Sequence, residues 1–198
     1  MILSQTNLRD AVAAREIEFD PPLEDRQWGE ASIDLRLGCT FTKIQRADGL
    51  IVSVADALGS IGRTKLWDTI EIDPAAGFGK QKFFILEPGE FILGLTHESI
   101  RVPNNLIALV EGRSTYARMG LSMHQTAPWI QPGWRGRIVL EMMNHGPLRI
   151  ALTPLVDRPC QLTFFELKDA VPETAVYGSR PTDRYKDQSH PLNHSGVA

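Results

Sequence analysis

A single glutamate on an apolar strand is the most chemically suggestive side chain in this sequence. Strand alternation in the segment 138–143, IVLEMM, places Glu141 between Val139 and Met143 on one face. Such apolar surroundings disfavour the charged carboxylate and predict a raised pKa, which suits a group that takes and gives a proton. The alternative is a structural carboxylate paired with Arg137 on the same face. The opposite face carries Ile138, Leu140 and Met142.

The glutamate lies in a locally basic segment of an otherwise acidic chain. Residues 110–143 hold four arginines (Arg113, Arg118, Arg135 and Arg137) against two glutamates, whereas the whole chain has a net charge of −3. Turn-forming clusters at 111–114 and 131–134 interrupt the apolar runs of this segment. The segment 110–143 therefore combines a candidate acid/base with polar turns, the pattern of a binding site.

Composition bounds the class of protein. The chain has 198 residues with 21 basic and 24 acidic side chains, a balance that argues against a general nucleic-acid or membrane binder. No apolar run reaches the length of a membrane span, and the first residues do not form a signal peptide. Cys39 and Cys160 are isolated, which favours free thiols over a disulfide. We expect a cytoplasmic protein.

The elements that must position the candidate site are mostly short strands. A helix is expected over residues 4–15, capped by Ser4, followed by a half-buried strand at 31–38. In that strand Ile33, Leu35 and Leu37 should face inward, and Ser32, Asp34 and Arg36 outward. Residues 83–95 predict a hairpin around a Pro-Gly turn, and further strands are expected at 69–73, 106–110, 148–153 and 161–167. This spacing predicts an all-β sandwich or barrel.

The character of the chain changes beyond Glu166. Proline and glycine punctuate a polar tail, so we expect one domain over 1–171 and a C-terminal tail over 172–198. On composition alone, a tail of this kind is usually a frayed terminus.

Several motifs resemble the dCTP deaminase family, within the trimeric dUTPase-like superfamily. They are GRSTYARMGL at 112–121, AxWIxPGWRGxIxLE at 127–141, ASIDLRLG at 31–38, the opening residues 1–22, and Tyr177 followed by RYKDQ at 184–188. The resemblance covers nearly the whole chain. It implies a dUTPase-like distorted jelly-roll or β-barrel, with a short N-terminal helix and a flexible C-terminal tail that closes over a nucleotide.

The resemblance also implies an activity and partners. The activity is the deamination of dCTP to dUTP and ammonia, hydrolysis of the C–N bond of a cyclic amidine. The family is homotrimeric, binds Mg²⁺ through the substrate triphosphate, and makes dTTP a candidate inhibitor. No binding to nucleic acid or membrane is implied.

The motifs carry candidate site residues with them. By resemblance, Glu141 is the acid/base, Ser114 and Arg118 support the water and substrate, and the Ala127 carbonyl orients the water. The other substrate-binding positions that the resemblance implies are Arg113, Thr115, Trp129, Gln131, Trp134, Tyr177, Arg184 and Gln188. The turn at Arg113 and Ser114 would hold phosphate, although by itself such a turn is usually solvated surface. Trp134 would pack near the deoxyribose, and by itself it is as well explained as core. Arg184 stands where lysine is common in the family.

Zinc chemistry does not fit the sequence. Zinc deaminases need an H-x-E and a P-C-x-x-C signature. Here the two cysteines are far apart and His124 is followed by Gln-Thr. We therefore expect no zinc and no protein-held metal, with proton transfer left to a raised-pKa acid/base.

Three departures keep alternatives open. Gln131 stands where aspartate is usual, Trp129 resembles the dUMP-forming branch, and 153–162 lacks the usual glycine turn. The favoured product is dUTP, because a glutamine amide cannot serve as the base for triphosphate hydrolysis. The alternatives are a bifunctional enzyme releasing dUMP and pyrophosphate, and a non-catalytic nucleotide-binding regulator.

Overall fold

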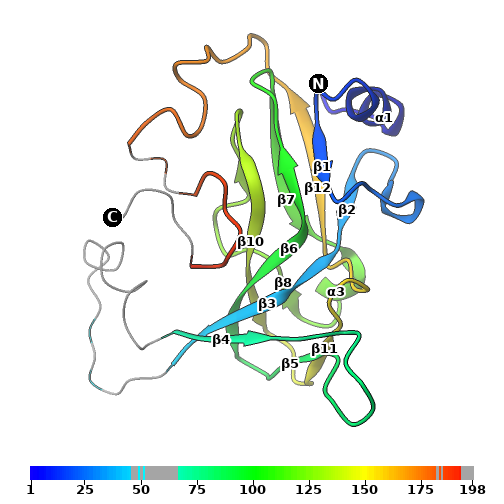
Figure 1. The fold of residues 1–198 in the computed structure, drawn as a ribbon, viewed down its shortest axis with the longest axis vertical. Coiled ribbons are helices and arrows are strands. Elements are labelled where there is room, and N and C mark those ends of the chain that lie inside the picture. Colours follow the sequence, from blue (N-terminus) through cyan, green and yellow to red (C-terminus); the bar gives the residue numbers. More distant parts are fainter. Residues whose placement is uncertain (46–48, 50, 52–66, 182, 184, 193–198) are drawn as a thin grey trace.

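The computed structural model describes residues 1–45, 49, 51, 67–181, 183 and 185–192, and the strands in this part of the chain form three antiparallel sheets. The large sheet has the order β4-β3-β6-β10-β8, with β1 also pairing β6. The four-stranded sheet has the order β2-β12-β7-β9, and β5 pairs with β11. Figure 1 shows the two larger sheets running side by side through the molecule.

Most of the expected elements are present, but the strand expected at 31–38 is divided in two, and the short strands at 18–20, 121–122 and 129–130 were not expected. The helical elements are α1 (Gln5–Ala13), the 3-10 turn η1 (Asp25–Gln27) and α3 (Ser114–Ala117). The strands are β1 (Glu18–Asp20), β2 (Ile33–Leu35), β3 (Leu37–Ile44), β4 (Trp67–Glu71), β5 (Phe84–Leu86), β6 (Phe91–Arg101), β7 (Leu106–Gly112), β8 (Leu121–Ser122), β9 (Trp129–Ile130), β10 (Arg135–Asn144), β11 (Ile150–Leu152) and β12 (Cys160–Glu166). The strand expected at 69–73 lies two residues earlier, as β4.

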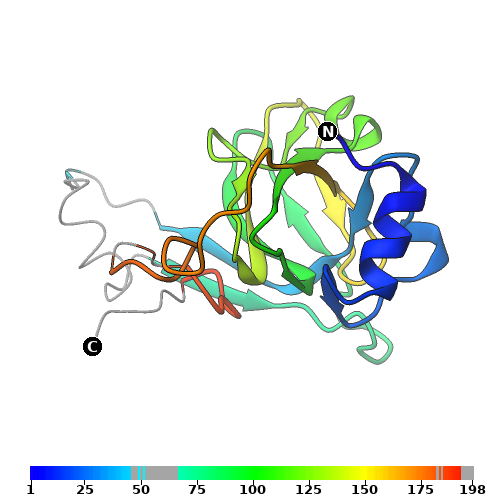
Figure 2. The ribbon, with the colours of Figure 1, turned by 90° about the horizontal axis from the view of Figure 1, so that it is seen from above.

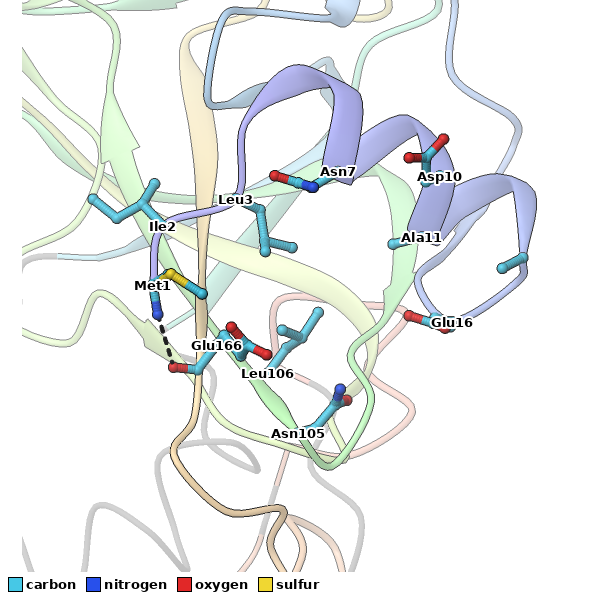
Figure 3. Close-up of a pocket in the computed structure, with 11 residues that line it drawn as sticks. Met1, Ile2, Leu3, Asn7, Asp10, Ala11, Glu16, Asn105, Leu106 and Glu166 are labelled. Atoms are coloured by element: carbon cyan, nitrogen blue, oxygen red, sulfur yellow. Dashed lines mark hydrogen bonds between the residues drawn. The ribbon is translucent and has the colours of Figure 1, made fainter.

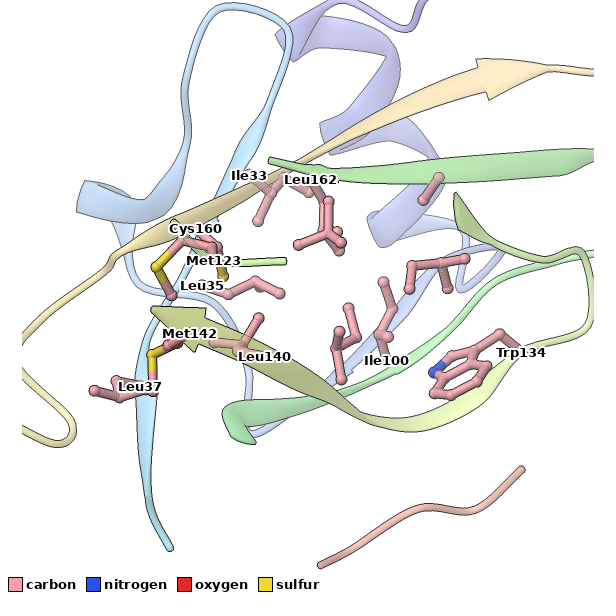
Figure 4. Close-up of a cluster of buried hydrophobic side chains, with 14 of the residues drawn as sticks. Ile33, Leu35, Leu37, Ile100, Met123, Trp134, Leu140, Met142, Cys160 and Leu162 are labelled. Atoms are coloured by element: carbon pink, nitrogen blue, oxygen red, sulfur yellow. The ribbon is translucent and has the colours of Figure 1, made fainter. Parts of the chain in front are cut away.

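The core fills the space between the large and four-stranded sheets. Figure 4 shows Ile33 and Leu162 of the four-stranded sheet facing Ile100 and Leu140 of the large sheet. Along β10, side chains alternate between buried and half-buried, which is the burial that its sequence pattern predicts. The expected all-β class is confirmed, but the sheets are not closed into a barrel.

Helix α1 covers one side of the core, near the C-terminal end of β12 (Figure 2). The Ser4 hydroxyl accepts a hydrogen bond from the Asn7 N–H, and the Asn7 side chain accepts one from the Ser4 N–H, so the expected cap is present. Leu8 is fully buried and holds the helix on the core. In the described part of the chain, no helix is long and apolar enough to cross a membrane.

The prediction of a hairpin at 83–95 is wrong. The turn at Glu87–Glu90 forms, with Gly89 at φ 75° and the Glu90 N–H donating to the Glu87 carbonyl at 3.1 Å. The flanking strands then diverge, since β5 pairs with β11 whereas β6 pairs with β3 and β10. A local turn motif fixes a reversal of the chain but does not choose the strand partners, which depend on distant side chains.

The outward orientation expected for Asp34 and Arg36 is also wrong, because both are only 9% exposed. The chain passes between the two larger sheets here, leaving β2 at Leu35 and starting β3 at Leu37. The Arg36 guanidinium pairs with Glu98 at 2.6 Å and Glu24 at 2.5 Å, and Asp34 pairs with Arg113 at 3.1 Å. Burial of both charged side chains is possible because each has a partner of opposite charge.

The tail docks on the beginning of β10 (Figure 1). The Asp187 N–H donates to the Arg135 carbonyl at 2.7 Å, and the Arg137 N–H donates to the Gln188 carbonyl at 2.8 Å. The Asp187 carboxylate also pairs with the Arg135 guanidinium. A Cβ at Gly136, which lies at φ 133°, would come within 2.6 Å of the Gln188 nitrogen, so glycine is required for this approach.

Replacing Glu98 with glutamine should strongly destabilise the fold. Glu98 is fully buried and accepts from Gln27, the Arg36 backbone and the Arg36 guanidinium. Removal of its charge leaves buried Arg36 only partly compensated, so the free energy of unfolding should fall by about 3 kcal/mol. The measurement is urea denaturation at fixed protein concentration. Glu87→Gln, in an exposed pair with Arg149, is the control and should cost less than about 1 kcal/mol. Equal midpoints for the two variants would contradict this account.

Replacing Asp187 with asparagine should loosen the tail. Arg135 holds the pKa of the Asp187 carboxyl below its ordinary value by hydrogen bonding and charge. The stabilisation is therefore present at neutral pH and lost only as the pH falls through that lowered pKa. Hydrogen exchange of the Arg137 and Asp187 amides should become roughly two- to fivefold faster in Asp187→Asn, with protection at Leu140 unchanged. Unchanged protection at both tail contacts would show that the ion pair does not hold the tail.

Candidate functional site

A cavity of about 290 Å³ is lined by residues of β6, β7, β9 and β10. Its walls come from these strands, from residues 127–134 and from the docked tail. It brings together seven of the site residues expected from the sequence: Glu141, Ala127, Trp129, Gln131, Trp134, Tyr177 and Gln188. The remaining lining side chains are largely apolar, among them Leu93, Ile138 and Val139.

Glu141 reaches this cavity from the middle of β10. Its side chain is half-buried, and its Oε2 accepts from the Gln125 N–H at 3.1 Å. The Gln125 amide also donates to the Glu141 backbone carbonyl at 3.2 Å. In the described part of the chain, no ion pair joins Arg137 to Glu141. The alternative that Glu141 is a structural carboxylate paired with Arg137 is therefore not found.

A bulge in β10 sets the direction of Glu141. The register with β6 shifts between Arg137 and Val139, and the Thr96 hydroxyl accepts from the Ile138 N–H at 2.9 Å within this bulge. Beyond it, Glu141 lies opposite Leu93 of β6. Bulges commonly re-aim side chains beside binding sites. The apolar neighbours of Glu141 are thus the pair Val139 and Leu93 on the cavity floor.

Two tryptophans form another wall of the cavity, and Trp134 adjoins the tail. Trp134 is 7% exposed, donates from its indole N–H to the Gly136 carbonyl at 3.2 Å, and packs against the Tyr177 ring at 5.2 Å between centroids. It is therefore both core and cavity wall. Trp129 is 50% exposed and meets Phe165 edge-on at 5.9 Å. Gln131 is exposed on the same turn, with its amide free to reach the cavity.

The tail closes the remaining side. The Tyr177 N–H donates to the Pro132 carbonyl at 2.8 Å, and the Tyr177 hydroxyl accepts from the Tyr185 N–H at 3.1 Å. Burial raises the pKa of the Tyr177 phenol, which remains a neutral donor at physiological pH. Gln188 is 5% exposed at the end of this wall. Arg184, the remaining tail residue expected in the site, lies outside the described residues.

Four expected residues lie away from this cavity. Arg113, Ser114, Thr115 and Arg118 belong to α3 and its caps, and none of them lines it. In Figure 1 α3 and the docked tail lie on either side of β10. Ser114 and Thr115 are exposed, and their backbone N–H groups have no acceptor among the described residues. Within one chain, the candidate phosphate turn and the candidate acid/base do not form one site.

Two residues with polar side chains line the cavity although they were not among the expected site residues. His124 lines the cavity, and its Nε2 lies 3.2 Å from the Glu111 carboxylate, whereas its Nδ1 has no partner in the described part of the chain. Its place directly before Gln-Thr-Ala was the available signal. Tyr185 also lines the cavity. No local pattern marks it, because its position depends on how the tail docks.

A second cavity, of about 410 Å³, lies between α1 and the end of β12. Figure 3 shows Asp10, Glu16 and Glu166 around it, with the Met1 amino group donating to the Glu166 carbonyl at 3.4 Å. None of the expected site residues lines it. Among the described residues, no group of three or more His, Cys, Asp and Glu side chains is placed to hold a metal ion.

This chain is similar to known proteins over nearly its whole length. A sequence model described as dCTP deaminase-like matches residues 2–167. A dCTP deaminase from Rhodospirillum rubrum is 38% identical, over 97% of this chain and 95% of that protein. A dUMP-forming dCTP deaminase from Halobacterium salinarum is 37% identical, over 96% of this chain and 92% of that protein.

The fold was compared with solved structures in the same way. A dCTP deaminase structure from Agrobacterium tumefaciens has a TM-score of 0.62 and 21% identity, over 82% of this chain and 48% of that longer chain. This supports the all-β fold, and the sequence relatives establish the family. The chain belongs to the dCTP deaminase-like family.

Proposed function

We propose that this protein deaminates dCTP to dUTP and ammonia. The observation that carries the proposal is Glu141, a half-buried carboxylate on the floor of a largely apolar cavity beside the Ala127 backbone. The family membership supports the choice of substrate. A cavity of about 290 Å³ with aromatic walls and a few polar groups is suited to a base and its sugar.

The chemistry asks for a water, a base and an acid. Water attacks C4 of cytosine as Glu141 takes a proton from it and delivers that proton to the ring nitrogen. Glu141 then transfers the proton of the new C4 hydroxyl to the amino group, and the C4–N bond breaks as ammonia leaves and the C4 carbonyl forms. The Gln125 N–H fixes one Glu141 oxygen, which leaves the other to face the substrate. The Ala127 carbonyl orients the attacking water. Trp134 packs near the deoxyribose, and Gln131 hydrogen-bonds the sugar hydroxyl.

The complete site requires more than one subunit. The turn that carries Arg113, Ser114 and Thr115 would bind the triphosphate, and Ser114 and Arg118 would support the attacking water. Since these residues lie away from the Glu141 cavity of their own chain, a neighbouring copy must supply them. A homotrimer with shared sites meets this requirement. Tyr177, Arg184 and Gln188 of the tail would then close over the nucleotide and exclude water.

The metal required is the one that accompanies the substrate. Mg²⁺ would bind through the triphosphate, which carries its own oxygen ligands. Zinc plays no part in the proposal, because the chain lacks the zinc-deaminase signature. Cys160 is also an unsuitable ligand, since complete burial raises the pKa of its thiol well above the ordinary value. dTTP is proposed as an inhibitor of the same site, and the cytoplasmic location stays a prediction.

The product proposed is dUTP rather than dUMP. Release of pyrophosphate needs a second water activated near the α-phosphate, and the Gln131 amide is not basic enough to activate it. The second candidate is the bifunctional activity, favoured by Trp129 and by a dUMP-forming relative of similar identity. We rank it second because either activity tolerates a bulky wall residue, whereas a missing base is harder to replace. A regulator without activity is disfavoured by retention of Glu141, Ser114 and Arg118.

Replacing Glu141 with glutamine should abolish most turnover while leaving binding. The amide keeps the shape of the side chain and removes the proton carrier, so kcat should fall at least about 100-fold. Affinity for dCTP, measured by calorimetry, should change far less. Glu166→Gln, which lines the other cavity, is the matched control and should keep full turnover. Near-normal turnover in Glu141→Gln would exclude the acid/base role.

Mixing two inactive variants should restore activity if the sites are shared between subunits. Glu141→Gln and Arg118→Ala are each expected to be inactive as pure trimers. In trimers formed at random from equal amounts, about one quarter of the sites would combine an intact Glu141 with an intact Arg118 from its neighbour. Co-expression with two different tags isolates the mixed trimers. Failure of such trimers to recover activity would place both residues in one subunit.

A further inference from the structure

The loop between β11 and β12 is one of the parts of the chain that depart from the family pattern. Residues 153–159 contain no glycine, and Leu155 nevertheless adopts a left-handed conformation at φ 64°. Asp157 closes the loop, since its Oδ2 accepts from the Thr153 N–H at 2.6 Å. The Leu155 N–H donates to the Leu37 carbonyl, and the Leu37 N–H donates to the Asp157 carbonyl. The loop is thus fixed to the start of β3.

This loop makes four hydrogen bonds to the segment that contains α3. The Tyr116 hydroxyl donates to Asp157 Oδ1 at 2.9 Å and accepts from the Arg158 N–H at 3.2 Å. The Arg113 N–H donates to the Pro159 carbonyl at 2.9 Å, and Arg113 Nη1 donates to the Arg158 carbonyl at 3.0 Å. All four bonds join residues 113–116 to residues 157–159.

Charge holds the same segment from the other side. Asp34, 9% exposed, pairs with the Arg113 guanidinium at 3.1 Å and with the Arg158 guanidinium at 3.6 Å. Burial raises the pKa of Asp34, and the two arginines oppose that rise. Asp34 therefore faces two guanidinium groups, whereas the Asp157 carboxylate accepts from the Tyr116 hydroxyl and the Thr153 N–H. The Arg113 guanidinium retains further N–H groups that these contacts do not use.

Within α3, Tyr116 alone packs against the hydrophobic core. None of its four residues is buried, and Ser114, Thr115 and Ala117 are exposed. Only Arg113 and Tyr116 turn inward, and both contact loop 153–159. Tyr116 is half-buried, and its burial and its bond to Asp157 raise the pKa of the phenol to about 12. A neutral phenol donating to a carboxylate makes a stronger hydrogen bond than a neutral pair.

We propose that Tyr116 and Asp157 are positioning residues, and that through them loop 153–159 holds the Arg113–Arg118 segment in the geometry that binds the phosphates of the substrate. This inference rests on the proposed function, which assigns that segment to the triphosphate. Neither residue contacts the nucleotide. The departures of residues 153–159 from the family pattern then have a role, which is to supply Asp157 and the two carbonyl groups that accept from Arg113.

The test compares ligands that differ only in their phosphates. Tyr116→Phe keeps the ring and removes the hydroxyl, and Asp157→Asn removes the charge. Each should weaken dCTP binding about 3- to 10-fold, the range for one hydrogen bond, while dCMP binding changes little. The double variant should lose no more than the worse single variant, because both substitutions break the same contact. Inorganic tripolyphosphate is a second probe and should lose affinity in parallel with dCTP.

The controls separate positioning from general damage. Glu87→Gln, in the exposed pair with Arg149, should leave every affinity unchanged. Equal losses for dCTP and dCMP, or additive losses in the double variant, would overturn the positioning role. If the unmodified protein turns over dCTP and both variants bind it normally, this inference alone fails. If the unmodified protein binds neither dCTP nor tripolyphosphate, the proposed function fails with it.

Discussion

The pairing of β10 with β6 is the constraint on which the site depends. Because side chains alternate along a strand, the same pairing buries Leu140 in the core and presents Glu141 to the cavity. A slip of one residue would exchange these positions. In the bulge after Arg137, the Ile138 N–H donates to the Thr96 hydroxyl. The pairing register of Leu140 and Glu141 with β6 begins beyond this bulge. The core residue Leu140 and the candidate acid/base Glu141 thus lie on opposite faces of one strand.

The beginning of β10 also receives the tail. Gly136 permits the close approach of Gln188, and Arg135 holds Asp187, so the cavity obtains its last wall from residues about 50 positions later. The α3 segment, which lies away from this cavity in the same chain, is held differently. It is exposed, has no buried residue, and is held by the loop before β12. The tail and the α3 segment are thus held by separate sets of contacts.

The sequence predicted the structure correctly where the local alternation of apolar and polar residues determines it. The two faces of β10, the Ser4 cap and the strands β7 and β12 follow from apolar periodicity and capping alone. Family motifs placed seven candidate residues that do line one cavity. The alternating pattern wrongly predicted that Asp34 and Arg36 are exposed to solvent. The pattern assumes that one face of the strand is solvated and takes no account of buried partners such as Glu98.

Contacts between distant segments could not be read from local pattern. The turn at Gly89 was correct, but the partner of β5 is β11, some 65 residues away. His124 and Tyr185 enter the cavity through the path of the chain rather than through a motif. The hydrogen bond between Tyr116 and Asp157 spans 41 positions and needs the folded loop before it can be seen.

The most direct test of the central claim is the identity of the product formed from dCTP. The purified protein is incubated with dCTP and Mg²⁺, and the nucleotides, ammonia and pyrophosphate are quantified over time by chromatography and coupled assays. The account predicts dUTP and ammonia in equal amounts, with no pyrophosphate. Stoichiometric dUMP and pyrophosphate without free dUTP would contradict the role given to Gln131, and the absence of ammonia would contradict deamination itself.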